Sequence, residues 1–194
     1  WPTDADHAKA VEAFFDKYQI SHSQQEFEDH MYGKHNGYIM SHFFNRPIAG
    51  EELKKLEDEK ESMFREIYKD KVETIPHYLP FLEELKSRGF KTAVATSAPR
   101  ANLDLIINAL KIEDKMDSMM ASQDVQNHKP DPEVYLKSAE RVGVSPSDCV
   151  VFEDSFSGVT AGLNAGMKVV GVLSSHTKAQ LPPCNFYIND YREV

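Results

Sequence analysis

The second part of the chain alternates short apolar segments with amphipathic ones, and this pattern restricts the possible folds more than any other feature. We predict strands over 90–96, 117–122, 149–152, 168–173 and 186–188, with helices over 78–88, 101–110, 131–142 and 155–165 between them. Strands that alternate with helices in this way are typical of a parallel, doubly wound sheet. The expected fold class is therefore α/β, with a Rossmann-like core.

The first part of the chain contains only helical patterns, in which apolar residues recur at spacings of three and four. We predict helices over 5–18, 23–31, 38–44 and 50–69. A helical segment of this length before a Rossmann-like core indicates a cap, which can close over a site at the strand ends. We therefore expect a helical cap domain over 1–73 and the core over 74–194.

The charge balance excludes one class of partner. The 194 residues include 31 acidic and 22 basic side chains, with a net charge of -9. Nucleic-acid binding needs a basic surface, so we expect no nucleic-acid partner. No apolar run approaches the roughly 18 residues of a membrane span, and nothing resembles a signal peptide. We therefore expect a cytoplasmic protein without a membrane partner, and a monomer.

The strongest chemical feature is an apolar run over 150–152 that ends at two adjacent carboxylates, Glu153 and Asp154. Open α/β sheets bind their ligands at the carboxyl ends of the strands. Because neighbouring carboxylates repel each other, a bound cation explains why both stand there. Helix capping by Asp154 or Ser155 is the alternative, but it leaves Glu153 unexplained. The sequence therefore predicts a metal site at Glu153 and Asp154.

Two other segments place polar groups at strand ends or in the loops that follow them. Thr96 ends a predicted strand, and its hydroxyl, with the loop amides of Ser97 and Ala98, can bind phosphate oxygens. Thr-Ser pairs also end many strands for turn reasons. Lys129 opens the loop 129–132, which two prolines make rigid, and a fixed lysine is a point charge that can bind phosphate. A lone lysine is more often a solvated surface residue.

These motifs occur in a fixed order, and with them the chain resembles the haloacid dehalogenase superfamily, in particular its β-phosphoglucomutase-like phosphatases and phosphomutases. Thr96 matches the family's second motif, Lys129 its third, and Glu153 with Asp154 its fourth. The resemblance implies a Mg²⁺-dependent hydrolase that removes phosphate from a small phosphorylated metabolite, such as a sugar phosphate. It implies that Asp154 binds Mg²⁺ with Glu153 beside it. By the same resemblance Thr96 and the Ser97 amide hold phosphate, and Lys129 neutralises charge during the reaction.

The resemblance also implies substrate contacts in the helical part. His7 falls where related enzymes carry a histidine in the cap. Gly33, Lys34 and Asn36 lie at a break between helices, where relatives contact the substrate. Ordinary solvation of the loop is the alternative for Lys34. Asn36 stands near the position of an arginine in the mutases, which weakens the mutase hypothesis.

One motif of the family is missing from the chain: an apolar strand that ends in Asp-x-Asp, whose first aspartate attacks phosphorus to form an aspartyl-phosphate. Asp4 and Asp6 have the spacing, but no strand precedes them and a helix follows at once. We therefore expect the nucleophile upstream of Trp1, and an inactive protein if the chain were complete. Three hypotheses remain: a phosphatase, a sugar phosphomutase, and a non-catalytic fragment or pseudoenzyme that binds phosphorylated ligands.

Overall fold

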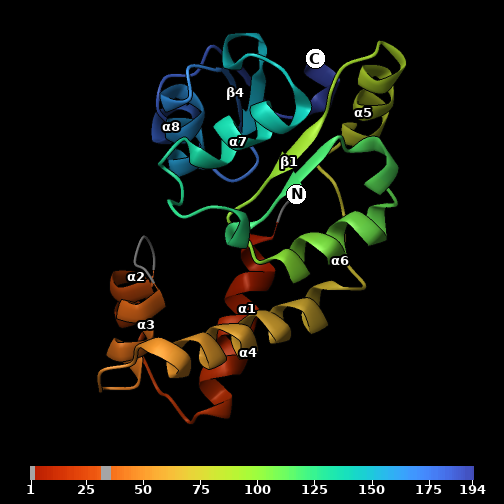
Figure 1. The fold of residues 1–194 in the computed structure, drawn as a ribbon. Coiled ribbons are helices and arrows are strands. Elements are labelled where there is room, and N and C mark those ends of the chain that lie inside the picture. The colour runs from red at the N-terminus through yellow and green to blue at the C-terminus, as the bar shows by residue number, and fades with distance from the viewer. Residues whose placement is uncertain (1–2, 32–35) are drawn as a thin grey trace. The chain divides into compact units, whose positions relative to one another are not determined.

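The computed structural model describes residues 3–31 and 36–194, and these form two compact units, 3–71 and 72–194 (Figure 1). Each unit has its own hydrophobic core, and the two are described separately. Across the described ranges, every helix is too short or too polar to cross a membrane.

The unit over 3–71 is helical in its described residues. Its elements are α1 (Asp4–Lys17), α2 (Gln24–Met31), α3 (Asn36–Phe43) and α4 (Gly50–Tyr68). Helices α1 and α4 pack side by side (Figure 1). The apolar stripe of α1 places Phe14 and Phe15 in the core, where they are 0% and 1% exposed. Met40 of α3 and Leu56 of α4 belong to the same core.

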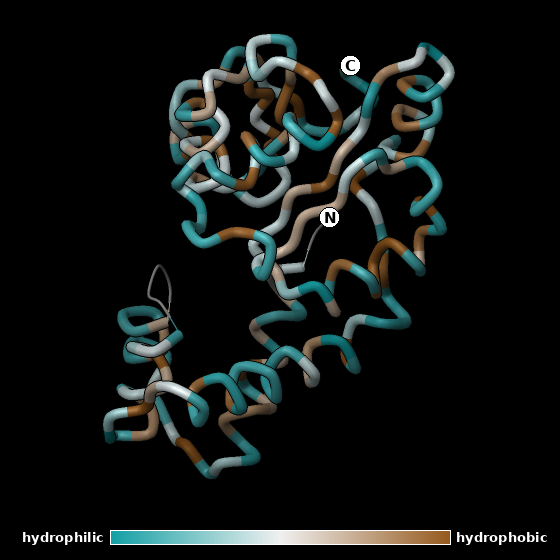
Figure 2. Tube along the Cα trace, in the orientation of Figure 1, coloured by the Kyte–Doolittle hydropathy of each residue, from teal (hydrophilic) through white to brown (hydrophobic). Residues whose placement is uncertain are grey.

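The unit over 72–194 alternates helices and strands, which confirms the α/β fold class. Its elements are α5 (Tyr78–Ser87), β1 (Ala93–Ala95), α6 (Arg100–Leu110), β2 (Ser118–Met120), α7 (Glu133–Val142), β3 (Val150–Glu153), α8 (Phe156–Asn164), β4 (Lys168–Val172) and β5 (Phe186–Ile188). Short 3-10 helices over 113–115, 122–124, 146–148, 178–180 and 191–193 complete it. In Figure 2, β1 is coloured towards the hydrophobic end of the scale.

All strand pairs in this unit are parallel, and they form two sheets, β1-β2 and β3-β4-β5. The register places Ala93 opposite Ser118, and Val150 opposite Lys168. Within residues 3–31 and 36–194, β1 pairs only with β2 and β3 only with β4. Each of these two strands therefore leaves one edge without a partner.

Strand β4 is buried on both faces, as expected for the middle strand of a parallel sheet. Val169 packs into a core with side chains of α7 and α8. Val170 and Val172 face the other way, into a cluster with Ile75 and Ile188. The sheet thus has apolar side chains on both of its faces, and its polar residues gather at the strand ends.

Several predicted boundaries differ from the observed ones by one to three residues, and two of them have a clear physical reason. The strand predicted over 90–96 begins only at Ala93. The backbone N–H of Thr92 donates to the side chain of Asp117 at 2.9 Å, so a carboxylate replaces the next strand's carbonyl at this point. Helix α7 begins at Glu133 and not at residue 131, because Asp131 lies before the helix and accepts the Glu133 amide at 2.9 Å.

Candidate active site

The side chain of Lys129 connects the carboxyl ends of β1 and β3. Its Nζ donates to the carbonyl oxygen of Ala95, the last residue of β1, at 3.2 Å. The same Nζ donates to Oε2 of Glu153, the last residue of β3, at 2.9 Å. The two side chains are only 8% and 12% exposed, so the ion pair is largely shielded from water. Two strands from different sheets therefore meet at one buried ion pair.

The loop that carries this lysine is held from two helices. In α8, Nδ2 of Asn164 donates to the carbonyl oxygen of Pro130 at 3.3 Å. In α7, Glu133 accepts the backbone N–H of Asn127 at 2.8 Å. A hydrogen bond from Lys137, followed by bonds from two loop amides, lowers the pKa of Glu133 to about 2. Glu133 is therefore ionised near neutral pH and keeps these acceptors in place.

The carboxylate of Glu153 is surrounded by protein donors. Besides Lys129, Oε2 accepts the hydroxyl of Tyr135 at 2.6 Å. Oε1 accepts the hydroxyl of Ser155 at 2.9 Å. Burial alone would raise the pKa of Glu153, but the charge of Lys129 and these hydrogen bonds outweigh it and lower the pKa. Glu153 is therefore a buried, ionised acceptor that joins the lysine loop to the start of α8.

Gly158 in α8 makes room for this carboxylate. A Cβ atom at Gly158 would lie 2.1 Å from Cδ of Glu153. We expect the added methyl group in Gly158→Ala to displace the Glu153 side chain from its present position. The free energy of unfolding should fall by about 1–3 kcal/mol, as it does when a core is overpacked. Urea titration of the variant measures this. Ser157→Ala, in the same turn of α8, is the control and should stay within about 0.5 kcal/mol; equal losses in both variants would contradict the steric argument.

Asp154 differs from its neighbour in having no basic partner in the described part of the chain. Its Oδ2 accepts the hydroxyls of Ser174 and Ser175, which follow β4, at 3.2 and 3.3 Å. Burial, and then repulsion from Glu153, raises the pKa of the Asp154 carboxyl. A cation placed here would relieve both effects. Carboxylate and hydroxyl oxygens are also the kind of ligand that Mg²⁺ prefers.

The described residues supply only part of a metal site. Nowhere in 3–31 or 36–194 do three or more His, Cys, Asp or Glu side chains gather as metal ligands. Mg²⁺ commonly binds proteins through one or two carboxylates, with substrate phosphate and water as further ligands. Asp154 fits this pattern as a carboxylate ligand, because it has no basic partner among the described residues. Glu153 lies next to it, with both oxygens already accepting hydrogen bonds from the protein.

The loop after β1 contains three hydrogen-bond donors that concern the site. The Ala98 amide is bonded within the loop, whereas the Thr96 hydroxyl and the Ser97 amide are available to a ligand. The hydroxyl oxygen of Thr96 accepts the backbone N–H of Ala98 at 3.0 Å, so this amide is used within the loop. The hydroxyl proton of Thr96 is still available to an incoming oxygen. The backbone N–H of Ser97 makes no hydrogen bond to any residue that the structure describes, and Ser97 is exposed.

The structure brings together Thr96, Lys129, Glu153 and Asp154, all at the carboxyl ends of strands in 72–194 or in the loops that follow. His7 and Asn36 belong to the helical unit. The His7 ring stacks flat on Phe64 of α4, with 3.8 Å between the ring centroids, and Asn36 begins α3. The predicted residues Gly33 and Lys34 lie outside the described residues.

Sequence reasoning missed three polar contacts of this site. Ser174 and Ser175 lie two and three residues after the end of β4, in a loop that corresponds to the one Thr96 opens after β1, so the strand-end rule could have identified them. Tyr135 is the third residue of α7. Its helical position indicates only that it faces inward, and its contact with β3 depends on how the helix packs.

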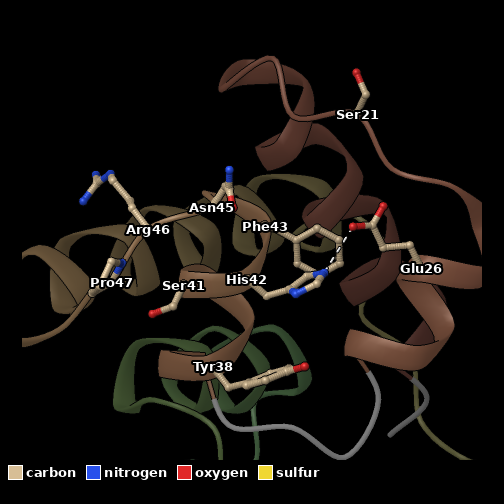
Figure 3. Close-up of a pocket in the computed structure, with 9 residues that line it drawn as sticks. All are labelled: Ser21, Glu26, Tyr38, Ser41, His42, Phe43, Asn45, Arg46 and Pro47. Atoms are coloured by element: carbon tan, nitrogen blue, oxygen red, sulfur yellow. Dashed lines mark hydrogen bonds and ion pairs between the residues drawn. The ribbon is translucent and has the colours of Figure 1, made fainter.

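The helical unit contains a cavity of about 770 Å³, lined by residues of α2, α3 and the segments beside them (Figure 3). Figure 3 shows His42 directed at Glu26, and the Nε2–Oε1 distance is 3.1 Å. Ser41 accepts the backbone N–H of Ile48 at 3.0 Å. Arg46 forms an ion pair with Glu52. The main polar groups of this cavity are therefore bonded to other residues of the helical unit.

Comparison with known proteins gives a consistent result. The sequence profile of the haloacid dehalogenase-like hydrolase family matches residues 2–172. A phosphorylated carbohydrates phosphatase from Thermotoga maritima is 40% identical over 123 residues, which are 63% of this chain and 55% of that protein. The chain spans about half the length of two curated relatives that it matches, 56% and 55%.

Solved structures share the fold over nearly the whole chain. A haloacid dehalogenase hydrolase of family IA from Entamoeba histolytica has a TM-score of 0.89 and 27% identity, covering 98% of this chain and 88% of its own. A β-phosphoglucomutase from Clostridium difficile has a TM-score of 0.81 and 24% identity, covering 99% and 86%. The Rossmann-like fold and the resemblance predicted from the three motifs are both confirmed.

Proposed function

Because the chain belongs to the haloacid dehalogenase-like hydrolase family, we propose that the protein removes phosphate from a small phosphorylated metabolite. The relative from Thermotoga maritima is named for phosphorylated carbohydrates. A sugar phosphate is therefore the substrate class that we favour.

The observation that carries this proposal is the placement of charge at the ends of β1 and β3. Lys129 is held between the Ala95 carbonyl and Glu153, and beside this pair stands Asp154, an acid with no basic partner among the described residues. A transferring phosphoryl group needs a fixed positive charge and a metal-binding acid beside the nucleophile that attacks it. Both features occur here within one small region.

In this proposal the loop after β1 binds the phosphate, and the acids at the end of β3 bind the metal. The Thr96 hydroxyl and the Ser97 amide hold phosphate oxygens, while the Ala98 amide supports the loop through its bond to Thr96. Lys129 faces the negative charge of the reacting groups. Asp154 would hold Mg²⁺ with Glu153 beside it, and an ion held there would supply positive charge next to the phosphate.

The aspartate nucleophile belongs, in our proposal, to a segment upstream of Trp1. The free edges of β1 and β3 support this, because a parallel strand inserted beside them would find hydrogen-bonding partners on both sides. The carboxyl end of that strand would then lie at the same edge as Lys129. Its aspartate would attack phosphorus and break the bond to the substrate oxygen, which leaves as an alcohol after taking a proton. Water would then hydrolyse the aspartyl-phosphate to inorganic phosphate and the free aspartate.

The helical unit selects the substrate in this scheme. His7 is held by its stacking on Phe64, which limits the rotation of the imidazole. We assign His7, Asn36, Gly33 and Lys34 to contacts with the non-reacting part of the substrate. Contacts of this kind would orient the substrate for the reaction.

The test uses the full-length protein, including the upstream segment. Phosphate release is measured for a panel of sugar phosphates, with Mg²⁺ and with a chelator in its place. We expect Mg²⁺-dependent release from at least one of them. Incubation with β-glucose 1-phosphate and a trace of bisphosphate separates the alternative, because glucose 6-phosphate as the product would indicate a mutase. No turnover of any phosphate ester would refute the proposal.

A further inference from the structure

Tyr135 contacts both members of the buried ion pair at the strand ends. It lies on α7 and is 7% exposed. Its hydroxyl donates to Oε2 of Glu153 at 2.6 Å, and Nζ of Lys129 lies over its ring, 4.8 Å from the centroid. A single side chain therefore contacts the acid through its hydroxyl and the base through its ring.

The ring limits where the lysine ammonium can go. A lysine side chain is long and flexible, and its charge is compact. Here the ammonium is enclosed by the Ala95 carbonyl, the Glu153 carboxylate and the face of the Tyr135 ring. A cation over an aromatic face is attracted to it, and more strongly when water is excluded, as it is around this pair.

The hydroxyl fixes the carboxylate in turn. Oε2 of Glu153 receives both the Tyr135 hydroxyl and the Lys129 ammonium, so rotation of the carboxylate would break two bonds at once. An ionised carboxylate has no proton to give, so the Tyr135 hydroxyl is the donor of this bond. The bond is charge-assisted and short, as expected for a hydroxyl on a carboxylate.

We propose that Tyr135 is a positioning residue that holds Lys129 and Glu153 in one arrangement at the ends of β1 and β3. Its effect on turnover rests on the proposed phosphatase function, whereas its effect on the placement of Lys129 does not. The two can therefore be measured separately on the same variants.

The chain offers a matched control in Tyr187 of β5. The Tyr187 hydroxyl accepts the backbone N–H of Cys184 at 2.9 Å, and Nζ of Lys178 lies 4.6 Å from the centre of its ring. Tyr187→Phe thus removes a bonded hydroxyl from a similar lysine–tyrosine pair that makes no contact with Glu153. Tyr135→Phe removes the hydroxyl and keeps the ring, and Tyr135→Leu removes both.

The first measurement is independent of activity. Full-length protein is treated with an acetylating N-hydroxysuccinimide ester, and modification of Lys129 is followed by peptide mass spectrometry. We expect Tyr135→Leu to raise the rate of Lys129 acetylation about tenfold, because the ammonium loses the ring that it contacts and can move more freely. Tyr135→Phe should raise this rate less. Tyr187→Phe should leave it unchanged. An unchanged rate in Tyr135→Leu, or an equal rise in Tyr187→Phe, would overturn the proposal.

The second measurement concerns turnover. Tyr135→Phe should lower kcat about tenfold and change KM less than about twofold, because the lysine acts on charge that develops during the reaction. Tyr135→Leu should lose more, and Tyr187→Phe should match the wild type. A larger change in KM than in kcat would contradict the positioning role. If the wild type releases no phosphate, the proposed function fails, and the acetylation rates still decide the role of Tyr135.

Discussion

Replacing Lys129 by methionine is expected to abolish turnover and to destabilise the folded protein at the same time. Methionine keeps the length of the side chain but leaves the buried Glu153 carboxylate without its counter-charge. Removing one partner of a buried pair costs about 3–5 kcal/mol, and losing a charge that stabilises the transition state costs about a hundredfold to a thousandfold in kcat. Urea unfolding and steady-state kinetics of the full-length protein measure the two effects.

Lys137→Met is the matched control for this variant. Lys137 pairs with Glu133 one turn away on α7, and its side chain is 43% exposed. The lysine of this pair is in contact with water, which screens its charge, so the control should change stability by less than about 1 kcal/mol. In Lys129→Met combined with Glu153→Gln, stability should recover while turnover stays lost. Wild-type kcat in Lys129→Met would exclude a reaction role for the lysine.

Asp154→Asn is expected to abolish turnover but to stabilise the metal-free protein. The asparagine keeps the shape of the side chain and removes a partly buried charge. Glu153 repels this charge, and among the described residues it has hydroxyl donors but no basic partner. Loss of the metal-binding acid should lower kcat by at least about a hundredfold, equivalent to a few kcal/mol. Thermal unfolding measures this. Without Mg²⁺, the midpoint of Asp154→Asn should be higher than that of the wild type, and adding Mg²⁺ should not raise the midpoint of the variant further.

The pH dependence of this gain has a definite sign. Because the pKa of Asp154 is raised in the folded state, the folded protein holds this proton more tightly than the unfolded chain does. Ionisation therefore destabilises the wild type above the raised pKa, and the advantage of Asp154→Asn is complete there. The advantage should vanish below the ordinary pKa of an aspartate. A midpoint that falls in the variant near neutral pH would contradict the account of a repelled carboxylate.

The two variants share a loss of activity but differ in the sign of their effect on stability. Lys129 is required to balance a buried charge, whereas Asp154 adds a charge that the protein alone does not balance. A residue that lowers stability and is present at a strand end is typical of a ligand site. The opposite signs thus separate the structural part of this region from its binding part.

The fold could be predicted from the sequence because it depends on local patterns. Each helix and strand of 72–194 carries its own periodicity, and alternation of the two types is enough to predict a parallel sheet. The start of β1 was missed because it depends on Asp117, a side chain 25 positions away that takes the Thr92 amide. Such a contact leaves no trace in the local pattern.

The sequence could predict which residues belong to the candidate site, but not how they contact one another. Strand ends identified Thr96, Glu153 and Asp154, and the proline-bounded loop identified Lys129, but the role of each stays a prediction. The sequence could not show that Lys129 and Glu153 pair with each other, because 24 positions separate them and the packing of α7 and α8 sets their distance. The same packing places the Tyr135 hydroxyl on Glu153.

Among the described residues, the main hydrophobic cluster of 3–71 and that of 72–194 have no residue in common. Phe14, Phe15 and Met40 belong to one cluster, and Val151, Val159 and Val169 to another. Substitutions in separate clusters have nearly additive effects. Under the proposed function, substitutions in the helical unit are expected to alter substrate preference while the groups at the ends of β1 and β3 stay unchanged. A mutant library confined to residues 3–71 is the way to explore such preferences.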